Sequence, residues 1–169
     1  MHEIENIYQT ELEHLLDGIK NSRNPYHTFT LSSLNGTSPE SRTIVLRGVD
    51  FDPLRIYFNA DYRSPKIQQL TKNHFCSSLF YDRERKSQLR FKCQAVLHYQ
   101  NDIAMKIWSN TALQSRKCYM GPHAPSKSLD EWHPNIPLEY LKTDPGKEHS
   151  KEGYINFTHV ELKIMKSDV

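Results

Sequence analysis

The segment Arg63-Ser64-Pro65-Lys66 has the residue types of an anion site at the start of a helix. Ser64 is a good N-cap residue, Pro65 suits the first helical position, and apolar residues follow at helical spacing. The first turn of a helix carries backbone N–H groups without intrahelical partners, and these groups attract anions. With Arg63 and Lys66 beside them, we expect a phosphate to receive backbone, hydroxyl and charge-assisted contacts. The same residues are also typical of an ordinary solvated helix start, which needs no ligand.

Two strands precede this helix start. The run from Ser41 to Val49 is rich in β-branched and aliphatic residues, and Leu54 to Asn59 follows it after the turn Asp50-Phe51-Asp52-Pro53. Because side chains alternate between the two faces of a strand, the first run presents a different set on each face. One face holds Arg42, Ile44 and Leu46, and the other holds Thr43, Val45 and Arg47.

The order of elements from Arg42 to Tyr99 resembles the flavin-binding core of the pyridoxamine 5'-phosphate oxidase family. It runs strand, hairpin, strand, Arg-Ser-x-Lys helix and then a strand pair, His74 to Tyr81 and Ser87 to Tyr99. The resemblance implies a split β-barrel that holds FMN at the interface of a homodimer. The flavin contacts it implies are the strand Arg42, Thr43, Ile44, Val45, Leu46 and Arg47, the pair Phe58 and Asn59, the phosphate clamp Arg63, Ser64 and Lys66, the ring-edge residue Gln88, and Ser126.

The chemistry of a flavin agrees with this set, because a flavin needs an anion clamp, polar groups at its pyrimidine edge and apolar walls. The Gln88 amide donates and accepts together, which suits that edge, although alone it would be typical of an exposed strand residue. Arg47 could stabilise reduced, anionic flavin, could face an acidic group of the substrate, or could be a strand-end arginine in water.

The resemblance weakens after Tyr99. The segments Asp102 to Asn110 and Thr111 to Met120 are predicted helices, and the loop that ends at Ser126 resembles the family segment that reaches the partner subunit's flavin. The arginine that the oxidases use for the substrate phosphate falls on Ala112, and the basic C-terminal motif has no match here. We therefore expect Trp108 to be a packing residue, and we expect no efficient oxidation of pyridoxamine 5'-phosphate.

Composition excludes several other classes of protein. The 22 basic and 20 acidic residues give a net charge of +2, which lacks the strong positive field of a nucleic-acid binder. The three cysteines form no Cys-x-x-Cys pair, which predicts reduced thiols and a cytoplasmic protein. The nine histidines lack metal-ligand spacing, and no apolar run has the length of a membrane span. The charged cluster from Asp82 to Lys86 predicts a solvated hairpin turn.

The fold class that these patterns favour is mainly β with flanking helices (α+β), as one FMN-binding split-barrel domain over residues 1–169. A helix is predicted at about residues 3–20, a first strand at Tyr26 to Leu34, a loop at 35–40, a mobile loop at Pro134 to Gly153, and a last strand at Gly153 to Met165. The function expected is that of an FMN-dependent oxidoreductase with a small-molecule substrate. The alternative is a non-catalytic flavin- or haem-binding split barrel, although haem needs an axial ligand that the histidine spacing does not nominate.

Overall fold

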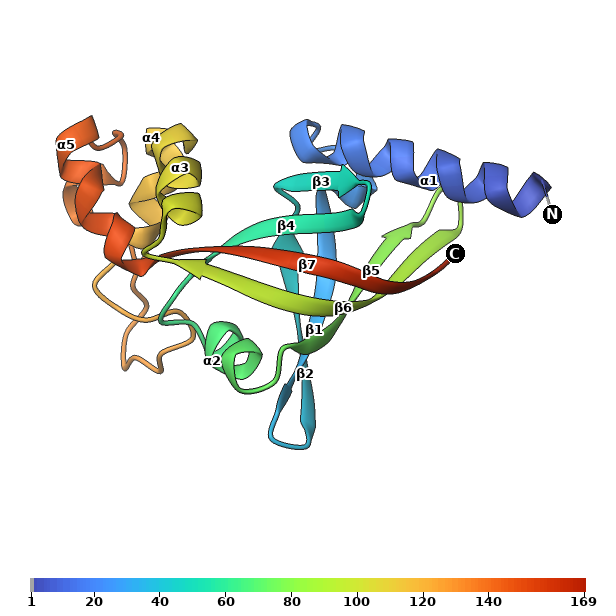
Figure 1. Ribbon diagram of the computed structural model, residues 1–169. Helices are drawn as coiled ribbons and strands as arrows, with labels where there is room; N and C mark the ends of the chain where they lie inside the picture. The colour runs from blue at the N-terminus through green and yellow to red at the C-terminus, as the bar shows by residue number, and fades with distance from the viewer. Residues whose placement is uncertain (1) are drawn as a thin grey trace. The chain divides into compact units, whose positions relative to one another are not determined.

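The computed structural model describes residues 2–169 of the chain, which form seven strands and five α-helices (Figure 1). None of the helices in this range has both the length and the apolar run that crossing a membrane requires. Short 3-10 turns occur at Pro25–His27, Lys117–Tyr119, Leu138–Tyr140 and Lys151–Asn156. The elements are α1 (His2–Lys20), β1 (Thr28–Asn35), β2 (Ser38–Val45), β3 (Gly48–Phe51), β4 (Leu54–Asp61), α2 (Pro65–Lys72), β5 (Phe75–Asp82), β6 (Ser87–Tyr99), α3 (Asp102–Asn110), α4 (Leu113–Arg116), α5 (Lys147–Ser150) and β7 (Phe157–Asp168).

The first hairpin is longer than the sequence predicts. Residues 38–40 belong to β2 rather than to a loop, and the turn is only Gly36 and Thr37, because Asn35 pairs directly with Ser38. Gly36 has a φ of +62°, which suits the first central position of a two-residue hairpin turn. Pro39 is tolerated because β2 is an edge strand, where a missing N–H breaks no ladder.

The strands form one antiparallel sheet in the order β2-β1-β5-β6-β7-β4-β3. Strands β2 and β3 therefore lie at opposite ends of the order, although only Leu46 and Arg47 separate them in the chain. The Leu46 N–H donates to the His27 carbonyl just before β1, at 2.9 Å, and the Arg47 N–H donates to the Tyr57 carbonyl of β4, at 2.8 Å. Each bond extends the strand pairing at one end of the order, and Leu46 and Arg47 are consecutive residues, so the two ends of the sheet meet and the sheet closes into a barrel.

The chain divides into two compact units. Unit 1 contains the chain up to Phe58, Gln69–Val96 and Val160–Val169, and unit 2 contains Asn59–Gln68 and Leu97–His159. The single domain expected over residues 1–169 stays a prediction.

The core of unit 1 is an aromatic cluster inside the barrel. Phe29 stacks on Phe80 with ring centroids 4.9 Å apart, and Phe58 and Phe91 add edge contacts to this pair. All four rings are at most 2% exposed. Burial of rings of this size supplies much of the stability of a small barrel, so this cluster fixes which strand faces point inward.

Helix α1 packs on unit 1 beside β3 and is also held by a buried ionic network (Figure 1). Glu11 of α1 accepts hydrogen bonds from the Tyr26 hydroxyl and from Arg85 Nη1, the latter at 2.6 Å, and Arg85 also pairs with Asp82. Residues 83–86 form an exposed hairpin turn, as predicted, whereas Asp82 at the end of β5 and Glu11 of α1 are buried. Arg85 in this turn bonds Glu11 of α1 and so holds α1 against the sheet.

The core of unit 2 surrounds Trp108. This side chain is 3% exposed and contacts the rings of Tyr119, Tyr154 and Phe157. The predicted packing role of Trp108 is therefore confirmed. The last strand begins at Phe157 rather than at Gly153, because the chain from Lys151 to Asn156 forms 3-10 turns against this cluster.

Candidate functional site

Of the six strand residues predicted as flavin contacts, Thr43, Val45 and Arg47 lie on the outer face of the sheet of unit 1. On β2 and the residues just after it, Ile44 and Leu46 are buried, whereas Thr43 and Arg47 are exposed. The predicted alternation of the two faces is therefore confirmed. Val45 lies half-buried on the same outer face as Thr43.

The strand register continues this outer face across four strands. Thr43 of β2 is opposite Thr30 of β1, which is opposite Leu79 of β5, which is opposite Arg90 of β6. Directly opposed residues in an antiparallel sheet share a face. Gln88 lies two residues before Arg90 on β6 and is also exposed, so the register places it on the same face as Thr43. With strands about 4.8 Å apart, β2 and β6 are separated by about 14 Å.

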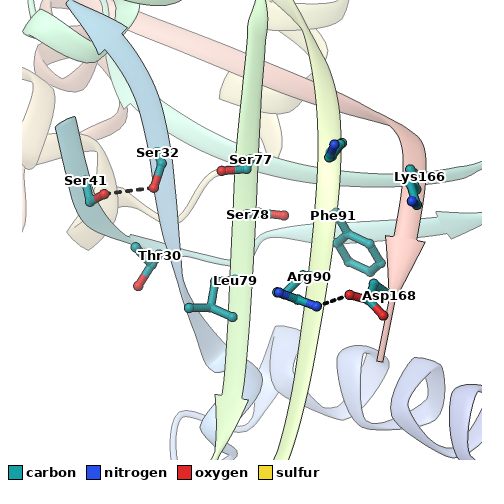
Figure 2. Close-up of a pocket in the computed structure, with 11 residues that line it drawn as sticks. Thr30, Ser32, Ser41, Ser77, Ser78, Leu79, Arg90, Phe91, Lys166 and Asp168 are labelled. Carbon is teal, nitrogen blue, oxygen red and sulfur yellow. Dashed lines mark hydrogen bonds and ion pairs between the residues drawn. The ribbon is translucent and has the colours of Figure 1, made fainter. Parts of the chain in front are cut away.

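A pocket of about 460 Å³ lies on this face (Figure 2). Its lining is rich in hydroxyl groups, and the Ser32 and Ser41 hydroxyls bond each other across β1 and β2 at 2.8 Å. Figure 2 shows Arg90 of β6 turned to Asp168 of β7, with which it forms an ion pair. The face is therefore hollowed and carries hydroxyl groups, with cationic side chains on one side, where Lys92 and Lys166 also contribute.

Arg42 points away from this face. Its Nη1 donates to Ser33 Oγ at 2.6 Å, and its Nη2 donates to Gln69 Oε1 at 2.9 Å. Gln69 in turn donates to Glu40 at 2.7 Å. Burial lowers the pKa of the Arg42 guanidinium. The side chain thus fastens the second half of α2 to the β1–β2 hairpin, which gives it a positioning role in this structure.

Phe58 and Asn59 lie side by side in the chain but have different surroundings. The Phe58 ring is fully buried in the barrel core, so only its backbone could approach a ligand. The Asn59 side-chain oxygen lies 2.8 Å from His159 Nδ1, within unit 2. Sequence reasoning missed His159, which is one hundred residues from its partner. The sequence around it gave no signal, because Thr158 and Glu161 are also polar residues at the start of this strand.

The start of α2 has an unusual serine. Ser64 is fully buried, and its Oγ has no hydrogen-bond partner within residues 2–169. Its carbonyl accepts the Ile67 N–H at 3.0 Å, so the residue occupies the N-cap position of an eight-residue helix without making the side-chain cap bond. At the start of α3, by contrast, the Asn101 side chain accepts the Ala104 N–H at 2.9 Å.

The cations expected beside Ser64 lie in the same part of the chain. Arg63 donates from Nε and Nη2 to the two carboxylate oxygens of Asp61, at 3.0 and 2.7 Å, and these bonds raise the pKa of Arg63. Lys66 is half-buried in the first turn of α2. The predicted clamp residues are thus close together in the chain, and the Arg63 guanidinium is bonded to the Asp61 carboxylate.

The remaining expected positions lie in unit 2. Ser126 is exposed with a φ of +65°, in the loop that follows α4. Ala112 is also exposed, just before α4. Arg116 is 4% exposed and donates to the carbonyls of Ser109 and Thr111 and to Ser150 Oγ, each at 3.0 Å. Arg116 is therefore committed to the protein interior.

Comparison with known proteins gives consistent findings. A family described as pyridoxamine 5'-phosphate oxidase, FMN-binding domain, matches residues 6–99. A pyridoxine/pyridoxamine 5'-phosphate oxidase 2 from Arabidopsis thaliana is 31% identical over 108 residues, which cover 60% of this chain and 54% of that protein. The chain therefore spans about half the length of this curated relative.

Solved structures share the fold. A pyridoxamine 5'-phosphate oxidase-related, FMN-binding protein from Nostoc punctiforme matches with a TM-score of 0.68 at 19% identity, over 95% of this chain and 81% of the other. PhzG from Burkholderia lata matches with a TM-score of 0.66 at 20% identity, over 94% and 76%. These neighbours confirm the α+β split-barrel fold. Because the family match covers more than half of the chain, this protein belongs to the pyridoxamine 5'-phosphate oxidase FMN-binding domain family.

Proposed function

We propose that this protein is an FMN-dependent oxidoreductase that acts on a small molecule as a homodimer, with the flavin at the subunit interface. Membership of an FMN-binding family supports the choice of cofactor. The observation that carries the proposal is the buried Ser64 hydroxyl without a partner at the start of α2.

A buried hydroxyl without a partner costs about 1–3 kcal/mol, so a fold that keeps one needs a compensating use for it. A phosphate oxygen at the start of α2 would accept the Ser64 O–H and lie at the positive end of the helix dipole. Lys66 supplies positive charge in the same four-residue stretch, and Arg63, which pairs with Asp61, supplies a second cation. A terminal phosphate, as in FMN, suits this donor set, and residues 2–169 contain no dinucleotide glycine fingerprint that would favour FAD.

Unit 1, taken by itself, has groups on the outer face of its sheet with the chemistry that a flavin ring needs. Gln88 offers both a donor and an acceptor to the pyrimidine edge, and the Thr43 and Val45 stretch offers backbone and side-chain contacts. Bound FMN supplies hydride or electron transfer. The role of the chain's own residues is to bind and orient the ring and to exclude water.

The substrate proposed here is not pyridoxamine 5'-phosphate. Ala112 offers no charge to a substrate phosphate, and Arg116 cannot replace it because its guanidinium is buried and bonded to the protein. Arg47 is exposed beside the outer face and remains available to an acidic group of the substrate.

The test is the flavin content and assembly state of the purified protein. We expect yellow protein that releases FMN on denaturation, identified by mass, and a dimer by size-exclusion chromatography with light scattering. FAD as the dominant flavin, or a colourless monomer that stays colourless after incubation with FMN, would overturn the proposal.

A further inference from the structure

Cys76 and Cys93 are opposite each other on neighbouring strands. The register of β5 and β6 pairs Cys76 directly with Cys93. Directly opposed residues of an antiparallel pair have Cα atoms about 4.5–5.5 Å apart and side chains on one face. Disulfides need Cα atoms about 4.4–6.8 Å apart, so the backbone already meets this requirement.

The side chains of this pair interact and face the inside of the sheet. The two thiols share a hydrogen bond, and the Ser78 hydroxyl lies 3.6 Å from Cys93 Sγ. Hydrogen bonds from Cys76 and Ser78 lower the pKa of the Cys93 thiol, whereas the hydrogen bond to Cys93 and burial raise the pKa of the Cys76 thiol. Cys93 is 2% exposed, whereas Cys76 is half-buried.

A second pocket gives small molecules a route to the pair. It has a volume of about 520 Å³ and is lined mainly by apolar groups, among them Leu34, Phe75 and Met165, together with both cysteines. An uncharged oxidant of the size of hydrogen peroxide fits such a pocket, whereas a bulky charged thiol reagent would have to desolvate to enter. Cys76 and Cys93 both line this pocket, so such an oxidant can reach either sulfur.

We propose that Cys76 and Cys93 are a redox modification site, at which a hydroperoxide converts the two thiols into a cross-strand disulfide. One sulfur of the pair attacks one peroxide oxygen, the O–O bond breaks, and the leaving hydroxide takes the thiol proton as water, which leaves a sulfenic acid. The other sulfur then attacks the oxidised sulfur, the S–O bond breaks, and the second thiol proton leaves with that oxygen as a second water. Two thiols are oxidised, and one peroxide is reduced to two waters.

The cysteine pair lies on β5 and β6, and the third cysteine provides an internal comparison. Cys118 is exposed in unit 2 and has no cysteine opposite it. Exposure alone would make Cys118 the first thiol to be oxidised. The strand register instead places Cys76 opposite Cys93, so this pair is the one that forms the disulfide.

The experiment treats the full-length, pre-reduced protein with hydrogen peroxide, alkylates the remaining thiols, and maps the peptides without reduction. We expect the intact protein to lose two hydrogen atoms, a single cross-linked peptide that joins Cys76 to Cys93, and alkylation at Cys118. Dithiothreitol should reverse the change. Cys118→Ser should behave in the same way, because it leaves the pair intact.

Two comparisons make the test specific. Oxidation in urea should give a mixture of the three pairings, because only the fold selects 76–93. Cys93→Ala should stop at oxidised Cys76 without a disulfide. Alkylation of both Cys76 and Cys93 after peroxide treatment of folded Cys118→Ser would overturn the proposal, as would over-oxidation of Cys76 alone. Both of these outcomes are measured in protein that keeps Cys76 and Cys93.

Discussion

Replacing Ser64 with alanine should change stability and FMN affinity in opposite directions. The Ser64 hydroxyl is fully buried and has no partner within residues 2–169, so the apo protein bears its desolvation cost of about 1–3 kcal/mol. Ser64→Ala removes that cost and breaks no cap bond. We therefore expect the free energy of unfolding of the apo protein to stay equal or to rise, by up to about 1–3 kcal/mol.

The same substitution should weaken FMN binding. A hydrogen bond to a charged group contributes about 1.5–3 kcal/mol, so the dissociation constant for FMN should rise about 10- to 150-fold. Flavin fluorescence titration measures the affinity, and urea unfolding followed by circular dichroism measures the stability.

Asn101→Ala is the matched control, because Asn101 makes the ordinary cap bond to Ala104. That variant should lose about 0.5–2 kcal/mol of stability and keep its FMN affinity. If Ser64→Ala instead behaves like Asn101→Ala, with lower stability and unchanged affinity, Ser64 is an ordinary cap and the reasoning about the phosphate is refuted.

Three further predictions follow from the ion pairs and from the substrate side. Arg63→Ala leaves the buried Asp61 carboxylate without its fork partner, so it should lower the free energy of unfolding by about 1–3 kcal/mol and also weaken FMN binding; denaturant and flavin titrations separate the two effects. Burial raises the pKa of Glu11, but hydrogen bonds from Tyr26 and Arg85 outweigh burial and lower this pKa from 4.5. The stability that the Glu11 carboxylate contributes is therefore present above about pH 4.5 and is lost as the pH falls. Between pH 7 and 3, the difference in free energy of unfolding between the unmodified protein and Glu11→Gln should shrink as the pH falls. FMN-saturated protein should oxidise pyridoxamine 5'-phosphate with a specificity constant lower by one to two powers of ten for each missing phosphate contact, about 1.5–3 kcal/mol apiece; peroxide formation equal to that of a genuine oxidase would contradict the assignment of Ala112.

Local patterns predicted most of the barrel strands because these strands follow simple periodicity. The run from Ser41 to Val49, predicted as one strand, is instead divided at Leu46 and Arg47 into β2 and β3. The alternation along β2 came from residue type alone, and burial in the structure follows it from Thr43 to Leu46. The helix near residues 3–20 followed from apolar spacing in the same way, and α1 lies there. Pro39 and its neighbours were assigned to a loop because composition does not reveal which strand becomes an edge.

The candidate site was harder to predict, because its contacts join distant residues. The partner of Asn59 is His159, and the partner of Arg42 is Gln69, and neither pairing leaves a spacing signal. The sequence also does not show which polar side chains become buried. The sequence identified Ser64 as a cap, but only the fold reveals that its hydroxyl is buried and lacks a cap bond.

The central claim, that the start of α2 holds the phosphate of FMN, is tested most directly by comparing FMN with riboflavin. The two ligands share the ring and differ in the phosphate, so their affinity ratio measures the clamp alone. Each charge-assisted contact contributes at least about 1.5 kcal/mol, so FMN should bind at least about tenfold tighter than riboflavin to the unmodified protein, and this ratio should shrink in Ser64→Ala. Equal affinities for FMN and riboflavin would contradict the account.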